Sequence, residues 1–466
     1  MAKKTVSHIV NVIGGGLAGS EAAYQLIRRG IRVKLYEMRP LVETGAHRTQ
    51  LLSELVCSNS MGSNLPDRAS GLLKEELRAM NSYILDSAYK YRVPAGQALA
   101  VDRDAFSREI TRFIKTHTMV EYINEEVTKI PEDEISVIAT GPLTSPTFVK
   151  TLISTFGAET LSFFDAIAPL LKADSVDMTK AFKANRYDDE NGGGDYINCP
   201  LSKVEYQNFV QELLKAEKIP LPAFEKDAKK MFFSACQPVE EIAASGLDSL
   251  RFGPMKPTGL TDPVEQRRPY AIVQLRQDNL LGSLFNMVGF QTNLKFSEQK
   301  RVFSMIPALA NAEFIRYGQM HRNIFLQSPL ILNEFMQVKK HPNIFIGGQI
   351  TGVEGYCEST GTGLLAGLNV SRLLLDKPMI SPPPESILGA LIKYITFPGH
   401  KHFTPMNANF GLFDTSAESG KLMRSVTAVE DEKGEKSNVV KNSKADRKAI
   451  IVAIARKAFR EFMSKI

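Results

Sequence analysis

The 466-residue chain has four cysteines, no tryptophan and no long hydrophobic run. The cysteines, at 57, 199, 236 and 357, form no CxxC pair and lack the spacing of a zinc site. The sequence therefore argues against a disulfide scaffold, thioredoxin-like chemistry and a metal centre. The longest apolar runs end in glycine, short of the roughly 20 residues that a membrane helix needs. We expect free thiols, no metal and no membrane span.

Length and charge narrow the class further. A 43% hydrophobic content over 51.7 kDa supports two or more folded domains. The formal net charge is +6, and residues 441–466 hold eight Lys and Arg against two acidic residues. This excess suits a polyanionic partner, although a solvated, charged terminal helix explains it equally well. The opening MAKKTVSHIVNVIGGG shows no secretory cleavage pattern, which predicts a cytoplasmic location.

A glycine-rich turn near the N-terminus carries the strongest motif. Gly14, Gly16 and Gly19 have GxGxxG spacing, directly after a strand-like run and before a helical pattern, and Glu37 ends the next strand-like run. Glycines permit a tight turn and let a pyrophosphate approach the helix N-terminus, while an acidic residue at this place bonds ribose hydroxyls. The motif predicts a dinucleotide site, without deciding between FAD and NAD.

Two later strand-turn elements favour FAD. They resemble the elements of glutathione-reductase-type flavoproteins that contact the cofactor. The first is VIATGP, with Ala139 and Gly141, and the second is IFIGGQITG, around Gly348. An ordinary strand-to-helix turn is the alternative for the second element. The predicted cofactor-binding residues are Gly14, Gly15, Gly16, Leu17, Ala18, Gly19, Glu37, Gly141, Gly348, Gln349 and Gly352.

These patterns predict the α/β class: a glutathione-reductase-type, FAD-binding Rossmann domain with an inserted α+β domain. Residues 1–182 and 326–430 form the first domain, because strand, glycine-turn and helix patterns occur in both segments. Residues 183–325 form the insertion, where alternating runs such as YAIVQLRQ indicate antiparallel strands. Residues 431–466 form a basic, helical C-terminal tail. Within the first domain, residues 69–91 read as one helical stretch.

Two of the cysteines are candidate reagents. Cys57 is followed by the polar Ser58, Asn59 and Ser60, which suit a hydrophobic core poorly, and Cys236 precedes a proline and a helix-start pattern. A thiol near a helix N-terminus has a lowered pKa, as a nucleophile requires. A lone cysteine is more often a small buried hydrophobe, and this remains the interpretation of Cys199 and Cys357.

The predicted insertion also mixes basic and aromatic residues. This combination can clamp phosphates and stack bases, although a solvated face beside a core is the more common explanation. The residues are Lys256, Arg267, Arg268 and Arg276 with Phe252, Tyr270 and Phe290.

Motifs along most of the chain are shared with one known family. The shared motifs occur in the family's order between about residues 8 and 412. They are VIGGGLAGSEAAYQL, ELVCSNS, VPAGQALAVDRDAF, FGPMKPTGL, RPYAIVQLRQD, GQITGVEGYCES and PMNANFGL. The sequence resembles the folate- and FAD-dependent tRNA (uracil-5-)-methyltransferase family, TrmFO, which is itself similar to the GidA flavoproteins.

This resemblance implies a reaction and a set of roles. The family transfers a carbon from 5,10-methylenetetrahydrofolate to C5 of a uridine, usually position 54 in the tRNA T-loop, with FAD and NAD(P)H. The implied catalytic residues are Cys236, which attacks C6 of uracil, and Cys57 and Tyr356, which lie beside the flavin. Some relatives modify 23S ribosomal RNA, and the departures at Met61 and Gly62 keep that target open.

Three other classes compete with this interpretation. A disulfide-reductase-type flavin oxidoreductase needs a CxxxxC pair near the first helix, and the sequence has none. A non-catalytic flavin- and RNA-binding protein has no need for both Cys57 and Cys236. Methyl transfer from S-adenosylmethionine does not require the late flavin-side element.

Overall fold

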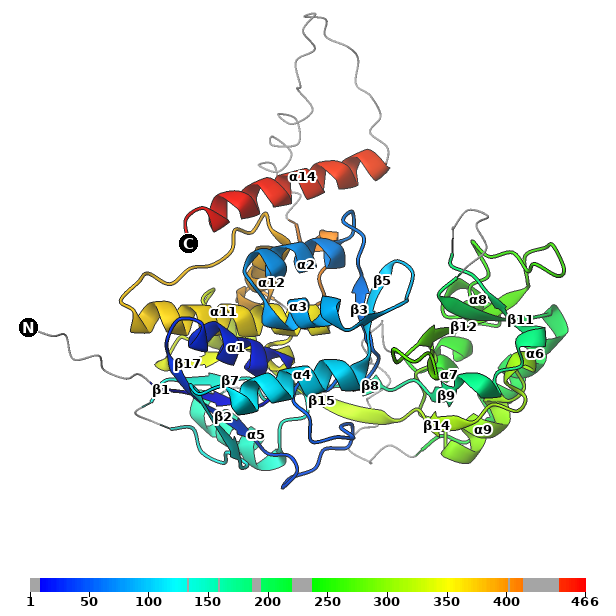
Figure 1. Cartoon of the computed structure of the whole chain (residues 1–466), viewed down its shortest axis with the longest axis horizontal. Helices are drawn as coiled ribbons and strands as arrows, with labels where there is room; N and C mark the ends of the chain where they lie inside the picture. The colour runs from blue at the N-terminus through cyan, green and yellow to red at the C-terminus, as the bar shows by residue number, and fades with distance from the viewer. Residues whose placement is uncertain are drawn as a thin grey trace, which may run out of the picture.

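A computed structural model describes residues 9–131, 134–157, 160–186, 194–219, 237–400, 403–413 and 444–466. Figure 1 shows two lobes side by side, one holding both ends of the described chain and the other formed by the middle of the sequence. Each lobe has its own six-stranded sheet and its own buried apolar cluster.

The first sheet is a parallel sheet with one antiparallel edge strand. Its strand order is β16-β17-β7-β1-β2-β6, in which only β16 runs antiparallel to its neighbour. The strands are β1 (Ile9–Ile13), β2 (Arg32–Glu37), β6 (Val120–Asn124), β7 (Ser136–Ile138), β16 (Gln337–Val338) and β17 (His341–Ile346). Two segments more than 190 residues apart thus share one sheet, and the predicted Rossmann fold is confirmed.

Helices cover this sheet and meet one another closely. They are α1 (Leu17–Ile27), α2 (Ala69–Ala79), α3 (Tyr83–Lys90), α4 (Arg103–Thr116), α5 (Pro146–Phe156), α11 (Tyr356–Leu374) and α12 (Ile387–Thr396). The tightest pair is α1 with α11. A Cβ at Gly363 would lie 2.3 Å from the Ala18 carbonyl oxygen, and one at Gly367 would lie 2.6 Å from that of Ala22. These two glycines let the helix backbones touch.

The stretch at 69–91, predicted as one helix, is two. Helix α2 ends before Met80, Asn81 adopts a left-handed conformation with φ 59°, and the Ser82 side chain accepts a hydrogen bond from the Leu85 amide to begin α3. A serine N-cap after an asparagine explains the break. The apolar positions retain a common face across the break, which is why their period suggested a single helix.

The second sheet is antiparallel, in the order β10-β11-β12-β13-β9-β14. Its strands are β9 (Leu170–Lys172), β10 (Phe182–Lys183), β11 (Tyr196–Leu201), β12 (Ala271–Gln277), β13 (Leu284–Met287) and β14 (Phe314–Arg316). Helices α6 (Lys203–Lys215), α7 (Val239–Ala244), α8 (Ser249–Phe252) and α9 (Phe296–Phe303) accompany it. Since β9 precedes residue 183 and pairs with β13 and β14, we propose that the second domain begins at β9.

Short elements complete the architecture. The antiparallel pair β8 (Thr160–Ala166) and β15 (Met320–Leu326) lies where the chain passes between the two sheets. A small sheet joins β3 (Ser60–Ser63), β4 (Arg92–Val93) and β5 (Ala98–Val101).

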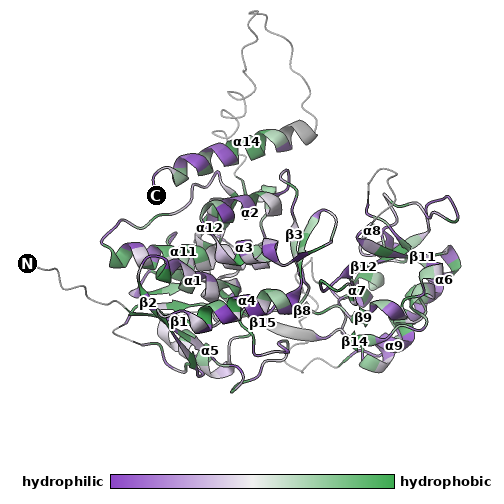
Figure 2. Cartoon of the chain, in the orientation of Figure 1, coloured by the Kyte–Doolittle hydropathy of each residue, from purple (hydrophilic) through white to green (hydrophobic). Residues whose placement is uncertain are grey.

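The C-terminal helix α14 (Lys444–Met463) packs on the first domain. Its Ala455 and Phe459 are buried in the first core, and Arg456 donates to the Glu75 carboxylate on α2 over 2.6 and 2.8 Å. Hydrophilic and hydrophobic residues alternate along it (Figure 2). Of the predicted basic tail, residues 431–443 lie outside the described residues.

Changing Gly363 to Ala should destabilise the α1–α11 contact. The added methyl group would meet the Ala18 backbone, which cannot move without shifting α1. We expect the free energy of unfolding to fall by about 2 kcal/mol, since overpacking outweighs alanine's better helix propensity. Gly361→Ala is the control on the same helix, because its Cβ would meet only Leu388 and Leu77 side-chain ends. Equal denaturation midpoints for the two variants would contradict the prediction.

Glu76 should make stability depend on pH. Its buried carboxylate accepts hydrogen bonds from the Ile387 and Leu388 amides at the start of α12, over 2.9 and 2.8 Å. Burial raises its pKa from 4.5 to about 8, so the folded protein holds this proton more tightly than the unfolded chain. Its contribution to stability is therefore complete below about pH 4.5 and declines as the pH rises through about 8.

Denaturant unfolding at pH 5 and pH 8 measures this effect. Glu76→Gln keeps an acceptor without a charge, so it should not share the loss of stability of the wild type at high pH. The free energy of unfolding of the variant minus that of the wild type should rise by at least about 1 kcal/mol from pH 5 to pH 8. The exposed Glu385→Gln, two residues before α12, is the control. A difference that does not change with pH for Glu76→Gln would refute the assignment.

Candidate dinucleotide and thiol site

Three glycines shape the turn between β1 and α1, each for a different reason. Gly14 has φ 108°, and a Cβ there would lie 2.5 Å from the Ala139 carbonyl oxygen. A Cβ at Gly19 would lie 1.8 Å from the Gly14 carbonyl oxygen, so the turn closes only with glycine there. At Gly16, the N-cap of α1, no atom lies within 4 Å of the Cβ position. The helix N-terminus therefore faces open space, where an anionic pyrophosphate is favoured.

This open space belongs to a cavity at the carboxyl ends of the parallel strands. Of the residues predicted from sequence, the following line the cavity: Gly14, Gly15, Gly16, Leu17, Ala18, Glu37, Gly141, Gly348, Gln349 and Tyr356. Gly19 packs on the Gly14 carbonyl oxygen instead, and a Cβ at Gly352 would meet the Phe403 ring at 2.5 Å. Sequence reasoning missed Arg39, His47 and Glu54, and around the predicted Gly141 it missed Thr140 and residues 142–145, which also line it.

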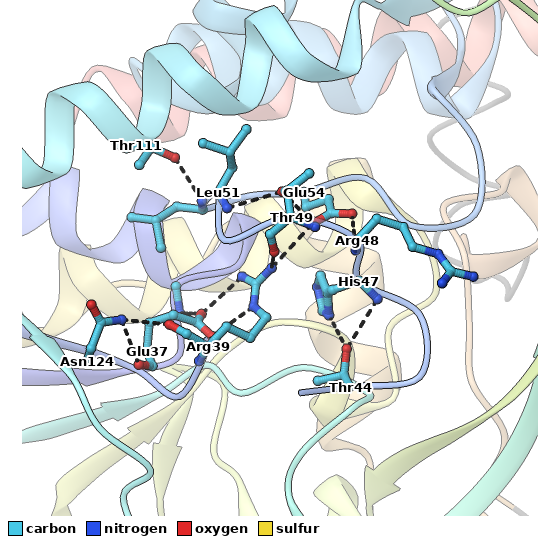
Figure 3. A network of polar contacts seen from close by, with 12 residues as sticks. Glu37, Arg39, Thr44, His47, Arg48, Thr49, Leu51, Glu54, Thr111 and Asn124 are labelled. Atoms are coloured by element: carbon cyan, nitrogen blue, oxygen red, sulfur yellow. Dashed lines mark hydrogen bonds and ion pairs between the residues drawn. The ribbon is translucent and has the colours of Figure 1, made fainter. Parts of the chain in front are cut away.

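Glu37 is held at the cavity by its neighbours (Figure 3). Its carboxylate accepts hydrogen bonds from the Gly15 amide at 3.0 Å, the Arg39 amide at 3.0 Å and Arg39 Nε at 2.9 Å. Burial alone would raise the pKa of Glu37, but the Arg39 guanidinium and these amides outweigh it and lower the pKa. Glu37 is therefore ionised and fixed, as an acceptor for ribose hydroxyls must be.

Arg39 links Glu37 to the loop before Cys57. Its Nη1 donates to Glu54 at 3.4 Å, and Glu54 in turn accepts from the Arg48 and Thr49 amides at 2.7 and 2.9 Å (Figure 3). This network positions one wall of the cavity. An open helix N-terminus, an ionised acidic residue and a positive-φ glycine at Gly141 together fit an adenine dinucleotide.

Tyr356 and Cys57 lie next to each other at the cavity's edge. The Tyr356 hydroxyl oxygen accepts hydrogen bonds from the Cys57 amide at 3.0 Å and the Ser58 amide at 3.3 Å. Burial raises the pKa of Tyr356 well above its usual value, so the hydroxyl stays protonated. Cys57 is half-buried, and its side chain interacts electrostatically with the Arg103 guanidinium. The start of α11 thus holds the backbone of the candidate thiol.

The second domain also contacts this segment. Asn59 donates from Nδ2 to the Val101 and Gln277 carbonyl oxygens, and Arg276 Nε donates to Asn59 Oδ1 at 3.0 Å. Arg103 donates from Nη1 to the Leu55 carbonyl oxygen at 2.9 Å and pairs with Asp278 at 2.9 Å. Cys57 therefore lies where the two domains meet.

Of the other three cysteines, two are described by the structure and one is not. Cys199 and Cys357 are buried, and burial raises their pKa values to about 12 and about 11, so both thiols stay protonated at neutral pH. Cys236, the predicted nucleophile, lies outside the described residues.

The basic and aromatic residues of the second domain divide between two places. Lys256, Arg267 and Arg268 are exposed around a surface hollow that Phe252 and Tyr270 also line. We call it the basic hollow. Phe290 belongs instead to the second core, and Arg276 is buried on the side that faces Asn59.

Two negative findings concern the described residues. Among them, no group of three or more His, Cys, Asp or Glu side chains is arranged to hold a metal ion. No described helix is long and apolar enough to cross a membrane.

The parallel sheet, the glycine turn and the fixed Glu37 define a Rossmann-type dinucleotide-binding protein, in which the Cys57 amide is bonded to the cavity residue Tyr356. The chain belongs to the family described as glucose inhibited division protein A, whose family model matches residues 9–378. The resemblance inferred from the motifs is confirmed.

Individual relatives agree with this assignment. The chain is 52% identical over 406 residues to "Methylenetetrahydrofolate--tRNA-(uracil-5-)-methyltransferase TrmFO" of Desulforamulus reducens, covering 87% of this chain and 91% of the relative. It is 52% identical over 415 residues to the protein of the same name from Lactobacillus acidophilus, covering 89% and 93%. Aquifex aeolicus GidA in its form II crystal shares the fold, with a TM-score of 0.65 at 14% identity over 99% of this chain and 89% of that one.

Tyr356→Phe should release the Cys57 segment. Removing the hydroxyl leaves the Cys57 and Ser58 amides without their acceptor, a loss of about 1 kcal/mol. We expect alkylation of Cys57 by iodoacetamide, followed on its peptide by mass spectrometry, to become about fivefold faster. Tyr89→Phe, which removes an exposed bond to Asn64, is the control. An unchanged alkylation rate would show that Tyr356 does not restrain this segment.

Proposed function

We propose that the protein methylates C5 of a uridine in tRNA, using 5,10-methylenetetrahydrofolate, FAD and NAD(P)H. The observation that carries the proposal is Cys57, whose amide is bonded to Tyr356 in the lining of a dinucleotide cavity, in a chain 52% identical to TrmFO proteins over most of its length. The proposed target is position 54 in the T-loop, and the proposed location is the cytoplasm, where tRNA is found.

FAD fits the residues of the cavity. Glu37 would bond the ribose hydroxyls, and the turn at Gly14, Gly15, Gly16 and Gly19 would hold the pyrophosphate at the start of α1, with Leu17 and Ala18. Gly141, Gly348, Gln349 and Gly352 come from the elements proposed to meet the flavin. Bound FAD, when reduced by NAD(P)H, supplies one-carbon transfer and hydride chemistry that amino acid side chains lack.

The thiols explain how uracil is activated. C5 of uracil is a weak nucleophile until a group adds to C6, and we assign this addition to the Cys236 thiolate. C5 of the ring then attacks the carbon that comes from methylenetetrahydrofolate, and the C5 proton must leave. Cys57 is our candidate acceptor, because it is half-buried and its side chain interacts electrostatically with the Arg103 guanidinium. Tyr356 fixes the Cys57 backbone, so a small movement of α11 would move the thiol.

The tRNA would bind through its phosphates. The basic hollow supplies Lys256, Arg267 and Arg268, and the exposed Phe252 beside them can stack on an unpaired base. A uridine in a structured loop must leave its stack to reach a buried cavity, which costs a few kcal/mol. Phosphate contacts away from the cavity offset this cost.

Methyl mapping tests the proposed function. The full-length holoenzyme, given methylenetetrahydrofolate, NAD(P)H and an unmodified tRNA transcript, should form 5-methyluridine at position 54, located by mass spectrometry. A parallel reaction with a 23S ribosomal RNA transcript tests the other target. Methylation of the ribosomal RNA alone would correct the substrate, and methylation of neither RNA would refute the proposal.

Cysteine variants separate the two thiol roles. Cys236→Ala should abolish both turnover and the covalent adduct with 5-fluorouridine tRNA, because the C6 nucleophile is lost. Cys57→Ala should lose turnover and keep the adduct. Cys199→Ala, at a buried thiol, is the matched control and should keep both. An adduct that survives in Cys236→Ala would assign the nucleophile to another residue.

A further inference from the structure

A row of residues crosses the second sheet on one face. Arg316 pairs with Leu170 after a shift in register between Phe314 and Arg316, and the row continues from Leu170 to Asn286, Arg276 and Tyr196. Residues that pair across neighbouring strands point to the same side of a sheet. The alternate positions of these strands form the second core and include Leu171, Ile197, Val273, Leu275 and Phe285. The row therefore points away from that core.

This face of the second sheet meets the first domain beside Cys57. Arg276 donates to Asn59, two residues beyond the thiol, and Asp278 pairs with Arg103, which also donates to the Leu55 carbonyl oxygen. Arg316 interacts electrostatically with Tyr356, one of the residues that line the cavity. The row thus faces the first domain beside the Cys57 segment and Tyr356.

Two members of the row have buried donors without an acceptor. Arg316 Nε and Nη2 and Asn286 Nδ2 are buried and make no hydrogen bond within the described part of the chain. Asn286 is only 1% exposed. Such donors are rare in folded proteins because each forfeits its bonds to water, at about 1–3 kcal/mol. Burial lowers the pKa of Arg316 to about 10, which leaves the guanidinium charged at neutral pH.

The charges here are also unbalanced. Arg103, Arg276 and Arg316 all interact with one carboxylate, that of Asp278, and Arg48 adds a further positive charge beside Arg316. Asp278 is already hydrogen-bonded to Arg103. The donors without an acceptor and the surplus of positive charge both favour the binding of an anion with several acceptor oxygens.

We propose that Arg316 and Asn286 bind a phosphate of the RNA substrate next to the target uridine. This inference rests on the proposed function and names the group that holds the nucleotide outside its stack. A phosphate fits better than a carboxylate of folate, because neither Arg316 nor Asn286 lines the cavity. A base that enters the cavity near Tyr356 leaves its phosphates outside, along the adjoining wall, where phosphate contacts fix its position.

The test compares Arg316→Gln with wild type in the full-length holoenzyme. Loss of one phosphate contact should raise the Kd for a tRNA transcript about tenfold and reduce the slope of log Kd against log salt by about 1. Arg316→Lys, which keeps the charge without the fork of donors, should recover part of the affinity. The KM for methylenetetrahydrofolate should remain at the wild-type value.

Controls separate this role from a structural one. Arg316→Gln removes buried donors that make no hydrogen bond within the described residues, so its thermal midpoint should not fall, whereas the loss of a structural residue would lower it. Lys215→Gln, on the exposed face of α6, removes one positive charge elsewhere in the domain and should leave the tRNA Kd unchanged.

The outcomes distinguish this proposal from the proposed function. An unchanged Kd and salt slope in Arg316→Gln, or a raised KM for methylenetetrahydrofolate alone, would overturn the phosphate site. If wild type binds tRNA in an Arg316-dependent way but forms no 5-methyluridine, the phosphate site stands and the proposed reaction fails.

Discussion

The contact between α1 and α11 decides where the two halves of the site lie. Gly363 and Gly367 bring α11 against the backbone at Ala18 and Ala22, closer than any larger residue permits. One helix begins at the glycine turn and the other at Tyr356, so their packing sets the position of the dinucleotide end against the thiol end. Because Tyr356 holds the Cys57 amide, the spacing of the helices also places the thiol.

Charged side chains near the two ends of the site differ in how far their charge is compensated within the protein. At the glycine turn, Glu37 is paired with Arg39 and the Gly15 amide, so its charge is compensated within the chain. At the domain junction, Arg276 and Arg316 add to Arg103, and Asp278 is the one carboxylate of the described residues with which all three are found to interact. A compensated site suits a neutral sugar edge, and an uncompensated one suits an anionic substrate. Glu37 and Arg39 line the cavity, whereas Arg103 and Arg276 lie next to it, where they bond the segment around Cys57.

Part of the fold and site followed from the sequence. Strand period, glycine spacing and the acidic residue after β2 are local signals, and they predicted the Rossmann unit, the turn at Gly14 and the place of Glu37. The break at Asn81 and Ser82 was missed because the regular spacing of apolar residues suggested one helix. Ser82 is a helix-capping residue that the sequence contains, but the prediction gave more weight to the spacing. The proposed start of the second domain at β9 differs from the predicted boundary at residue 183, because a three-residue strand has too short a pattern to stand out in the sequence.

The sequence by itself determined the class of fold, the dinucleotide turn and the polar setting of Cys57, because neighbouring residues suffice to specify turns and periodicity. The tertiary structure alone decided which residues surround the Cys57 segment: Tyr356, which accepts from the Cys57 amide, is 299 positions away, Asn59 is 217 from Arg276, and Arg103 is 175 from Asp278. The row from Arg316 to Tyr196 depends on strand register across five strands. Register is fixed between strands that lie far apart in the sequence, so the pattern of one segment does not reveal it.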